Sequence, residues 1–284
     1  SVLNEADIAH NIANVYGGGL YANSSNIVMS GLDIFDNMSG VSGGGMYADD
    51  SSVEIGATRI FSNMADENGG AIYVGGGSAT IEGTEIFLNT SDNYGGGVYI
   101  GAGSAVLSDT RVLSNTAEVG GGVFLGEGAA VLSRADIINN TSSLHGGGMA
   151  VYNGGDAVLE FTRVLSNTTG SGGGGLTINY GNAMLDHVVI AGNVAAYGGG
   201  IYNPGGALAL TNVTMVQNEV DGNGGGYSGG STSTAVLTFT TIAGNVTGSG
   251  GSGIAVAAGG AMTMHNTLVA GNNPSNCGSV VVSN

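Results

Sequence analysis

Three acidic side chains recur at one position of successive sequence repeats, where they could hold a divalent cation. Asp66, Asp92 and Glu118 each stand three residues after an asparagine of a repeating pattern, and Glu67 lies beside the first of them. Carboxylates stacked about 5 Å apart repel one another unless a cation screens them, and oxygen-rich sites suit Ca²⁺. The spacing therefore indicates a Ca²⁺ site, and no other cofactor; the alternative is a solvated face with splayed carboxylates.

A second pair of carboxylates could act on a polysaccharide. Glu160 and Asp186 each stand seven residues before an asparagine of the same pattern, and His187 follows Asp186. Hydrolysis needs paired carboxylates in a cleft, whereas a lyase needs a free arginine or lysine as base. The chain has no lysine, and its repeats carry no long inserted loops that could wall a cleft. We therefore expect no catalytic residues and a protein that is not an enzyme.

The four arginines are expected to form ion pairs between neighbouring repeats. Arg59, Arg111 and Arg163 alternate with acids in one column, and Arg134 stands one repeat away from Asp109. An exposed ion pair contributes only about 0–1 kcal/mol. The row would fix the register of the repeats, and it leaves no arginine for catalysis.

Two columns of large apolar side chains are expected to face outward and make contacts. The first suits protein–protein packing and comprises Phe35, Phe61, Phe87, Leu113, Ile138 and Leu165. The second suits sugar rings or a protein partner, because tyrosine offers a face and a hydroxyl, and comprises Tyr21, Tyr47, Tyr73, Tyr99, Phe124 and Tyr202. Monomers seldom leave such stripes, of roughly several hundred Å², exposed. The alternative is that loops or corners cover them.

One repeat of about 26 residues must position all of these columns. Its marker asparagine recurs at steps of 25 to 27 residues, at Asn11, Asn37, Asn63, Asn89, Asn115, Asn140, Asn167, Asn193, Asn218, Asn245 and Asn272. Apolar residues alternate with a spacing of two, and glycine triplets exclude helix. Three apolar columns predict three strands per turn. The chain is therefore expected to be all-β: a single-stranded right-handed parallel β-helix, with residues 1–284 as one domain of eleven rungs.

The marker asparagines are interpreted as an internal structural ladder. Each side-chain amide would bond the next asparagine and satisfy buried turn carbonyls. The glycines suit corners that need positive φ or close backbone approach. Rungs about 4.8 Å apart would give a rod of roughly 50 Å.

The repeat phrases resemble those of a known family. Residues 60–63 (IFSN) with 69–73 (GGAIY), and 86–89 (IFLN) with 95–99 (GGGVY), are similar to the repeats of polymorphic outer membrane proteins. They also resemble bacterial cell-surface parallel β-helix proteins more widely. The resemblance covers essentially the whole chain and rests on packing residues. It implies a secreted or surface-displayed protein, often an adhesin or an autotransporter passenger.

The amino-acid composition limits the classes of partner that the chain can bind. Among 284 residues, 57 are glycine, 21 are acidic and four are basic, giving a formal charge of −17. Nucleic acid is excluded because phosphate binding uses Lys and Arg, and no apolar run is long enough to cross a bilayer. Eight glycosylation sequons occur, and five of them begin at ladder asparagines that should be buried. Surface glycans fit best at Asn23, Asn139 and Asn212.

Near the C-terminus, Val280, Val281 and Val282 form a strand-like segment. We expect it to pair with the first rung of another copy, so that rods stack head to tail; the alternative is a truncated chain with caps elsewhere. The sequence thus predicts a non-enzymatic extracellular protein that self-associates, either an adhesin or a filament subunit. The second hypothesis is a carbohydrate-binding module, and the third is a polysaccharide lyase or hydrolase.

Overall fold

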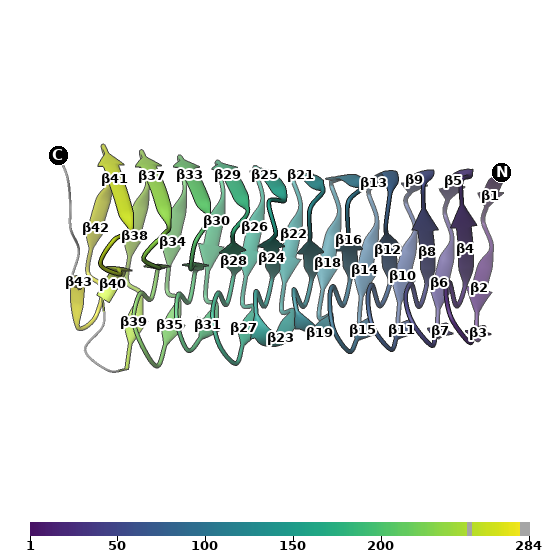
Figure 1. Cartoon of the computed structure of the whole chain (residues 1–284), viewed down its shortest axis with the longest axis horizontal. Helices are drawn as coiled ribbons and strands as arrows, with labels where there is room; N and C mark the ends of the chain where they lie inside the picture. Colours follow the sequence, from purple (N-terminus) through teal and green to yellow (C-terminus); the bar gives the residue numbers. More distant parts are fainter. Residues whose placement is uncertain (249–251, 279–284) are drawn as a thin grey trace.

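The structure, a computed structural model, describes residues 1–248 and 252–278. The chain winds into a rod of stacked rungs, with β1 (Val2–Asn4) at one end and β43 (Ser275–Cys277) at the other (Figure 1). Strands at the same position of successive rungs are neighbours and pair in parallel. Within these described residues, four sheets run along the rod, three with 11 strands and one with 10. The predicted right-handed parallel β-helix is confirmed, and the prediction of three strands per turn is wrong.

The four sheets are named here in the order in which a rung visits them. The first contains β1 (Val2–Asn4), β5 (Asn26–Ser30), β9 (Ser51–Gly56), β13 (Gly77–Glu82), β17 (Ser104–Ser108), β21 (Ala129–Ser133), β25 (Asp156–Glu160), β29 (Asn182–Asp186), β33 (Ala207–Thr211), β37 (Thr234–Thr238) and β41 (Ala261–His265). The second contains β2 (Asp7–Ala9), β6 (Asp33–Phe35), β10 (Arg59–Phe61), β14 (Glu85–Phe87), β18 (Arg111–Leu113), β22 (Asp136–Ile138), β26 (Arg163–Leu165), β30 (Val189–Ala191), β34 (Thr214–Val216), β38 (Thr241–Ala243) and β42 (Leu268–Ala270).

The other two sheets follow the ladder asparagine. The third contains β3 (Ile12–Ala13), β7 (Met38–Ser39), β11 (Met64–Ala65), β15 (Thr90–Ser91), β19 (Thr116–Val119), β23 (Thr141–His145), β27 (Thr168–Thr169), β31 (Val194–Ala195), β35 (Glu219–Val220) and β39 (Val246–Thr247). The fourth contains β4 (Leu20–Asn23), β8 (Met46–Asp49), β12 (Ile72–Val74), β16 (Val98–Ile100), β20 (Val123–Leu125), β24 (Met149–Tyr152), β28 (Leu176–Asn179), β32 (Ile201–Asn203), β36 (Tyr227–Gly229), β40 (Ser252–Val256) and β43 (Ser275–Cys277).

The apolar columns fill the interior of the rod. Ile60 and Ile86 are register partners in the second sheet, and Ile72 and Val98 are partners in the fourth. All four are essentially inaccessible to solvent. Each buried aliphatic side chain contributes roughly 1.5–3 kcal/mol of hydrophobic stabilisation. A slip of one residue would turn the whole column outward, so the packing fixes the register.

The asparagine ladder forms as predicted. The Nδ2 group of Asn63 donates to Oδ1 of Asn89 at 3.0 Å and to the carbonyl of Ile34 at 2.9 Å, and the Asn63 backbone N–H also donates to Asn89 Oδ1. The ladder asparagines from Asn37 to Asn272 are buried. Asn276 extends the ladder, because its Oδ1 accepts the backbone N–H of Asn272 at 3.0 Å. The 26-residue spacing could not reveal this member.

Glycine is needed at one of the corners. Gly69 has a φ of +66°, and a Cβ on the next residue, Gly70, would lie 2.4 Å from the carbonyl oxygens of Gly96 and Thr90. The residue just before the ladder asparagine also has a positive φ, yet Ser62 and Leu88 occupy this corner in two of the rungs. Glycine is therefore required where neighbouring backbones crowd together, whereas the corner before the ladder asparagine also accepts other residues.

Candidate binding groove

The tyrosine column projects outward from the fourth sheet as one continuous stack. The ring centroids of Tyr47 and Tyr73 lie 4.7 Å apart, those of Tyr73 and Tyr99 lie 4.8 Å apart, and those of Tyr99 and Phe124 lie 5.3 Å apart. The interplanar angles are 5° or less, so each ring covers the face of the next. Tyr47 and Phe124 are consequently only 8% and 5% exposed. Stacking of sugar rings on these faces, which the sequence suggested, is therefore blocked within the column.

The two ends of this column differ from its middle. Tyr21 continues the stack at 5.4 Å from Tyr47 and is 55% exposed. Tyr202 stands apart, because Ala150 and Thr177 occupy the two intervening rungs of its register. Its ring centroid lies 6.0 Å from that of His145.

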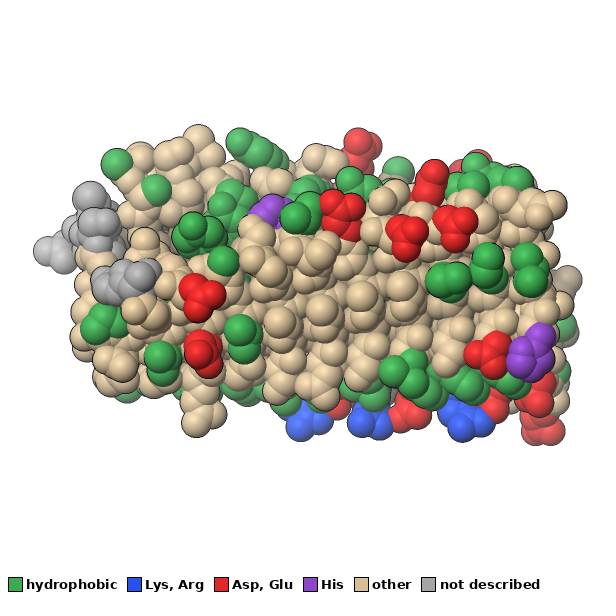
Figure 2. Space-filling model, turned by 90° about the horizontal axis from the view of Figure 1, so that it is seen from below, with side chains coloured by type: hydrophobic (Ala, Val, Ile, Leu, Met, Phe, Trp, Pro, Cys, Tyr) green, Lys and Arg blue, Asp and Glu red, His purple; other side chains and the backbone are tan. Residues whose placement is uncertain are grey.

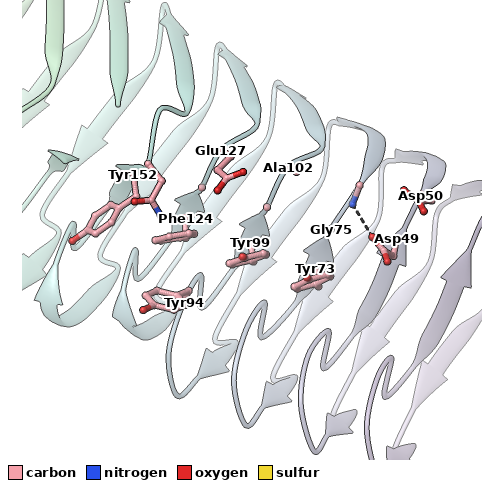
Figure 3. A pocket seen from close by; sticks show the side chains of 14 residues that line it. Asp49, Asp50, Tyr73, Gly75, Tyr94, Tyr99, Ala102, Phe124, Glu127 and Tyr152 are labelled. Carbon is pink, nitrogen blue, oxygen red and sulfur yellow. Dashed lines mark hydrogen bonds between the residues drawn. The ribbon is translucent and has the colours of Figure 1, made fainter. Parts of the chain in front are cut away.

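A groove of about 560 Å³ runs along the edges of the stacked rings. Figure 3 shows Tyr73, Tyr99 and Phe124 side by side on successive rungs, with Tyr94 below Phe124 and Tyr152 at one end. The groove spans the rungs from β8 to β24, which at about 4.8 Å per rung is roughly 19 Å. It is long enough for a linear ligand laid parallel to the rod axis.

The floor of the groove lies at the corner between the fourth and first sheets, where most residues are glycine. Three consecutive rungs turn there through 75–77, 101–103 and 126–128, where glycine predominates. The corner residues on either side of this stretch, Asp49–Asp50 and Asn153, carry side chains and close its two ends. These glycines are visible in the sequence, but they indicate a groove only once the three corners are known to be adjacent.

The charge in the groove is negative. Asp49, Asp50 and Glu127 line it, and none of its described lining residues is Lys, Arg or His. Asp49 Oδ1 accepts the backbone N–H of Gly76 at 2.9 Å. Sequence reasoning assigned none of these three acids to a site.

The tyrosine hydroxyls remain protonated at neutral pH. Burial raises the pKa of Tyr47 to about 12, with a further contribution from Asp49, and burial likewise raises the pKa of Tyr152 to about 12. The pKa values of Tyr73 and Tyr99 are also raised, first by burial and then by neighbouring phenols. The wall thus offers neutral hydroxyls, which both donate and accept hydrogen bonds.

The phenylalanine column stacks on the outside of the second sheet. Phe61 lies 4.9 Å from both Phe35 and Phe87 between ring centroids, and all three are half-buried. Leu113, Ile138 and Leu165 continue the column in register and are also half-buried. The column remains a candidate interface between protein chains.

The predicted ion pairs between rungs are present. Arg111 pairs with Glu85 at 2.5 Å, Arg134 with Asp109 at 2.6 Å and Arg163 with Asp136 at 2.6 Å. Arg59 pairs with Asp33 in the same manner. Basic and acidic side chains alternate along the lower edge of Figure 2. Each arginine bonds an acid of the preceding rung, so all four are engaged.

The predicted Ca²⁺ site is not assembled. Among residues 1–248 and 252–278, no three His, Cys, Asp or Glu side chains converge so that they could hold a metal ion. Asp66 and Glu67 are exposed on one turn, and Asp92 is exposed on the turn of the next rung. Glu118 is not held in register with Asp92, because its rung has one residue fewer between the partners Thr90↔Thr116 and Tyr94↔Val119. Splayed, solvated carboxylates therefore replace the expected site.

The carboxylate pair Glu160 and Asp186 does lie on adjacent strands. The two are register partners of β25 and β29 and line a shallow groove of about 380 Å³ with Val158 and Met184. The side chain of His187 contacts Asp186, with its Nδ1 2.9 Å from Oδ1. This hydrogen bond lowers the pKa of the Asp186 carboxyl. Such a group is suited to accept hydrogen bonds and poorly suited to donate a proton as a general acid.

The remaining candidate residues lie at the surface or outside the described residues. Asn23 and Asn139 are exposed, and exposed Asn212 donates to Asp186 at 3.3 Å. Glycosylation at these three positions stays a prediction. Val280, Val281 and Val282 fall outside the described residues, and head-to-tail pairing through them also stays a prediction.

The stacked sheets and their asparagine ladder define a right-handed parallel β-solenoid repeat protein. The chain belongs to the family described as "right handed beta helix region", which matches residues 121–284. No curated protein matches the chain. A solved structure of a TibC-catalyzed hyper-glycosylated TibA fragment is 16% identical, with 96% of this chain and 99% of that chain covered and a TM-score of 0.21. Within residues 1–248 and 252–278, no helix has the length and apolar character needed to span a membrane.

Proposed function

We propose that this chain is a non-enzymatic, extracellular interaction protein, a β-helical rod of the adhesin type that contacts its partner through the groove. The observation that carries the proposal is the continuous groove along five rungs, walled by ring edges and floored by glycine corners. It lies on a scaffold in which every rung is hydrogen-bonded to its neighbours. Such a scaffold presents a fixed surface, so little ordering entropy opposes binding. The resemblance to repeats of bacterial surface proteins supports the extracellular location.

A binding role accounts for the charged residues better than catalysis does. The arginines that a lyase could use as a base are held by Asp33, Glu85, Asp109 and Asp136. The pKa of Asp186 is lowered rather than raised, which disfavours the general-acid step of glycoside hydrolysis. The groove itself holds carboxylates, ring edges and backbone, which are groups for recognition.

A groove-filling variant tests this function. Ala102 is exposed on the groove floor, so Ala102→Phe fills the groove without requiring a new backbone conformation. Ala258, also exposed, lies at the same corner six repeats away, so Ala258→Phe is the matched control. We expect Ala102→Phe alone to abolish binding to immobilised extracellular polypeptides and glycans, measured by biolayer interferometry. Equal binding by the two variants would reject the groove, and release of sugar fragments from a polysaccharide panel would reject the non-enzymatic role.

A carbohydrate-binding module is the second candidate. It is favoured by Tyr94 and Tyr152, whose rings are tilted by 38° and 43° from Phe124 and so leave part of their faces uncovered. These rings could receive a sugar at one end of the groove. Retention of the wild-type chain, but not of Ala102→Phe, on a neutral glycan column would select this candidate.

Self-association through the phenylalanine column is a separate part of the proposal. The stacked rings of Phe35, Phe61 and Phe87 form a flat apolar strip, which a second rod could cover. Such contacts along the sides of rods would lead to bundles or filaments.

A further inference from the structure

We propose that the groove binds an extended basic segment of a partner polypeptide, with two Lys or Arg side chains placed four residues apart. This inference rests on the proposed function, because it assigns a ligand to the same groove. It names a chemistry that neither the fold nor the family specifies.

Charge complementarity is the first argument. Asp49, Asp50 and Glu127 face the groove, and the described lining contains no cationic side chain to balance them. The field of these acids reaches the ring wall: after burial and neighbouring phenols, Asp49 contributes to the raised pKa of Tyr73, and Glu127 contributes to that of Tyr99. The chain as a whole carries a formal charge of −17. A cationic ligand would be steered to this surface, and an anionic one would be repelled.

Spacing is the second argument. Asp49 ends β8 and Asp50 follows it, and Glu127 follows β20, three rungs further along the rod. At about 4.8 Å per rung, these acids are separated by roughly 14 Å along the axis. An extended chain advances about 3.4 Å per residue, so its side chains at positions i and i+4 are also roughly 14 Å apart and point to the same side. Two basic side chains with that spacing would each reach one of the two acidic positions, Asp49–Asp50 and Glu127.

The shape of the groove is the third argument. The glycine corners allow a peptide backbone to approach closely, and the ring edges of Tyr73 and Tyr99 offer apolar surface to the long stems of Lys or Arg. The faces of these two rings are covered by their neighbours, which removes the main contact that a sugar would make there. A peptide therefore uses the middle of the groove better than a glycan does.

Calorimetric titration with synthetic peptides tests the proposal. The probe is a blocked peptide with two lysines four positions apart; the controls place the lysines three positions apart, on opposite sides, or replace both with glutamate. We expect binding of the first peptide only. The triple variant Asp49→Asn/Asp50→Asn/Glu127→Gln should lose about tenfold in affinity, and Glu54→Gln, an exposed acid outside the groove, should lose none. Raising the salt concentration to about 0.5 M should weaken binding in the wild type.

The outcomes separate this inference from the proposed function. Equal affinity for both lysine spacings, or no effect of the triple variant, would show non-specific attraction and overturn the inference. If Ala102→Phe abolishes binding to the partner panel while the lysine peptide neither binds nor competes, the groove functions with another ligand and only the inference fails. If Ala102→Phe and Ala258→Phe bind the panel equally, the proposed function fails as well.

Discussion

Removal of one asparagine from the middle of the ladder should strongly destabilise the rod. Asn115 is fully buried, and its side chain takes part in four hydrogen bonds. Its Oδ1 accepts the backbone N–H and the Nδ2 of Asn89, both at 3.0 Å. Its Nδ2 donates to the carbonyl of Ile86 at 2.9 Å and to Asn140 Oδ1 at 3.0 Å. The substitution Asn115→Ala would remove all four bonds and leave buried partners unsatisfied.

The expected cost follows from these bonds. A buried hydrogen bond contributes about 1 kcal/mol net, so the loss of four should lower the free energy of unfolding by about 4 kcal/mol. Asn11 provides the comparison, because it is exposed and its side chain donates a single ladder bond, at 2.9 Å to Asn37. Asn11→Ala should therefore cost about 1 kcal/mol.

Urea denaturation measures the difference. It should be followed by circular dichroism and by tyrosine fluorescence, because repeat proteins can unfold in parts. Hydrogen exchange should show lost protection first in the rungs next to residue 115. A cost for Asn115→Ala no greater than that for Asn11→Ala would refute the reasoning, because the ladder would then contribute nothing beyond side-chain packing.

Three further predictions follow from other features. Burial raises the pKa of Tyr47 and Tyr152 from 10.0 to about 12, so the stabilising effect of these phenols is complete below pH 10 and is lost as the pH rises towards 12. A melting temperature that stays constant between pH 10 and 12, while phenol absorbance shows ionisation, would contradict this prediction. Phe61→Ser should shift any self-associated form towards monomer in sedimentation velocity, and an unchanged distribution of oligomers would exclude the phenylalanine column as an interface. Because Asp66 and Asp92 assemble no metal site, adding Ca²⁺ or a chelator should leave the melting temperature unchanged, and an increase with Ca²⁺ would show that the acids do converge on an ion.

The sequence predicted the fold well because each structural position recurs in eleven repeats. A column such as Ile60 and Ile86 carries the same packing constraint in every rung, and the ladder asparagines carry the same hydrogen bonds. The third sheet was missed because most of its strands, such as Met64–Ala65, are two residues long and show no alternation. Asn276 was missed because it joins the ladder after four residues, outside the period.

The candidate site was less predictable, because it depends on distances between rungs. Sequence reasoning found the column containing Tyr73 and Tyr99, but it could not show that the rung spacing brings the rings into face-to-face contact at 4.8 Å. The same limit affected the acids, because the one-residue-shorter segment between Thr116 and Val119 moves Glu118 out of register with Asp92. Three-dimensional adjacency of the corners then revealed Asp49 and Glu127, which no motif had marked.

The whole-rung repeat has a consequence for how such a protein could change its length. A segment from one ladder asparagine to the next, such as 64–89, contains one strand for each sheet, so its duplication or loss would leave the neighbouring strands in register. Each event would change the reach of the molecule by about 4.8 Å. The groove occupies only the rungs from β8 to β24, so events beyond β24 would alter reach without altering the groove. The rungs beyond β24 would thus act as a spacer whose length can change by duplication in the gene, without any change in the ligand that the groove binds.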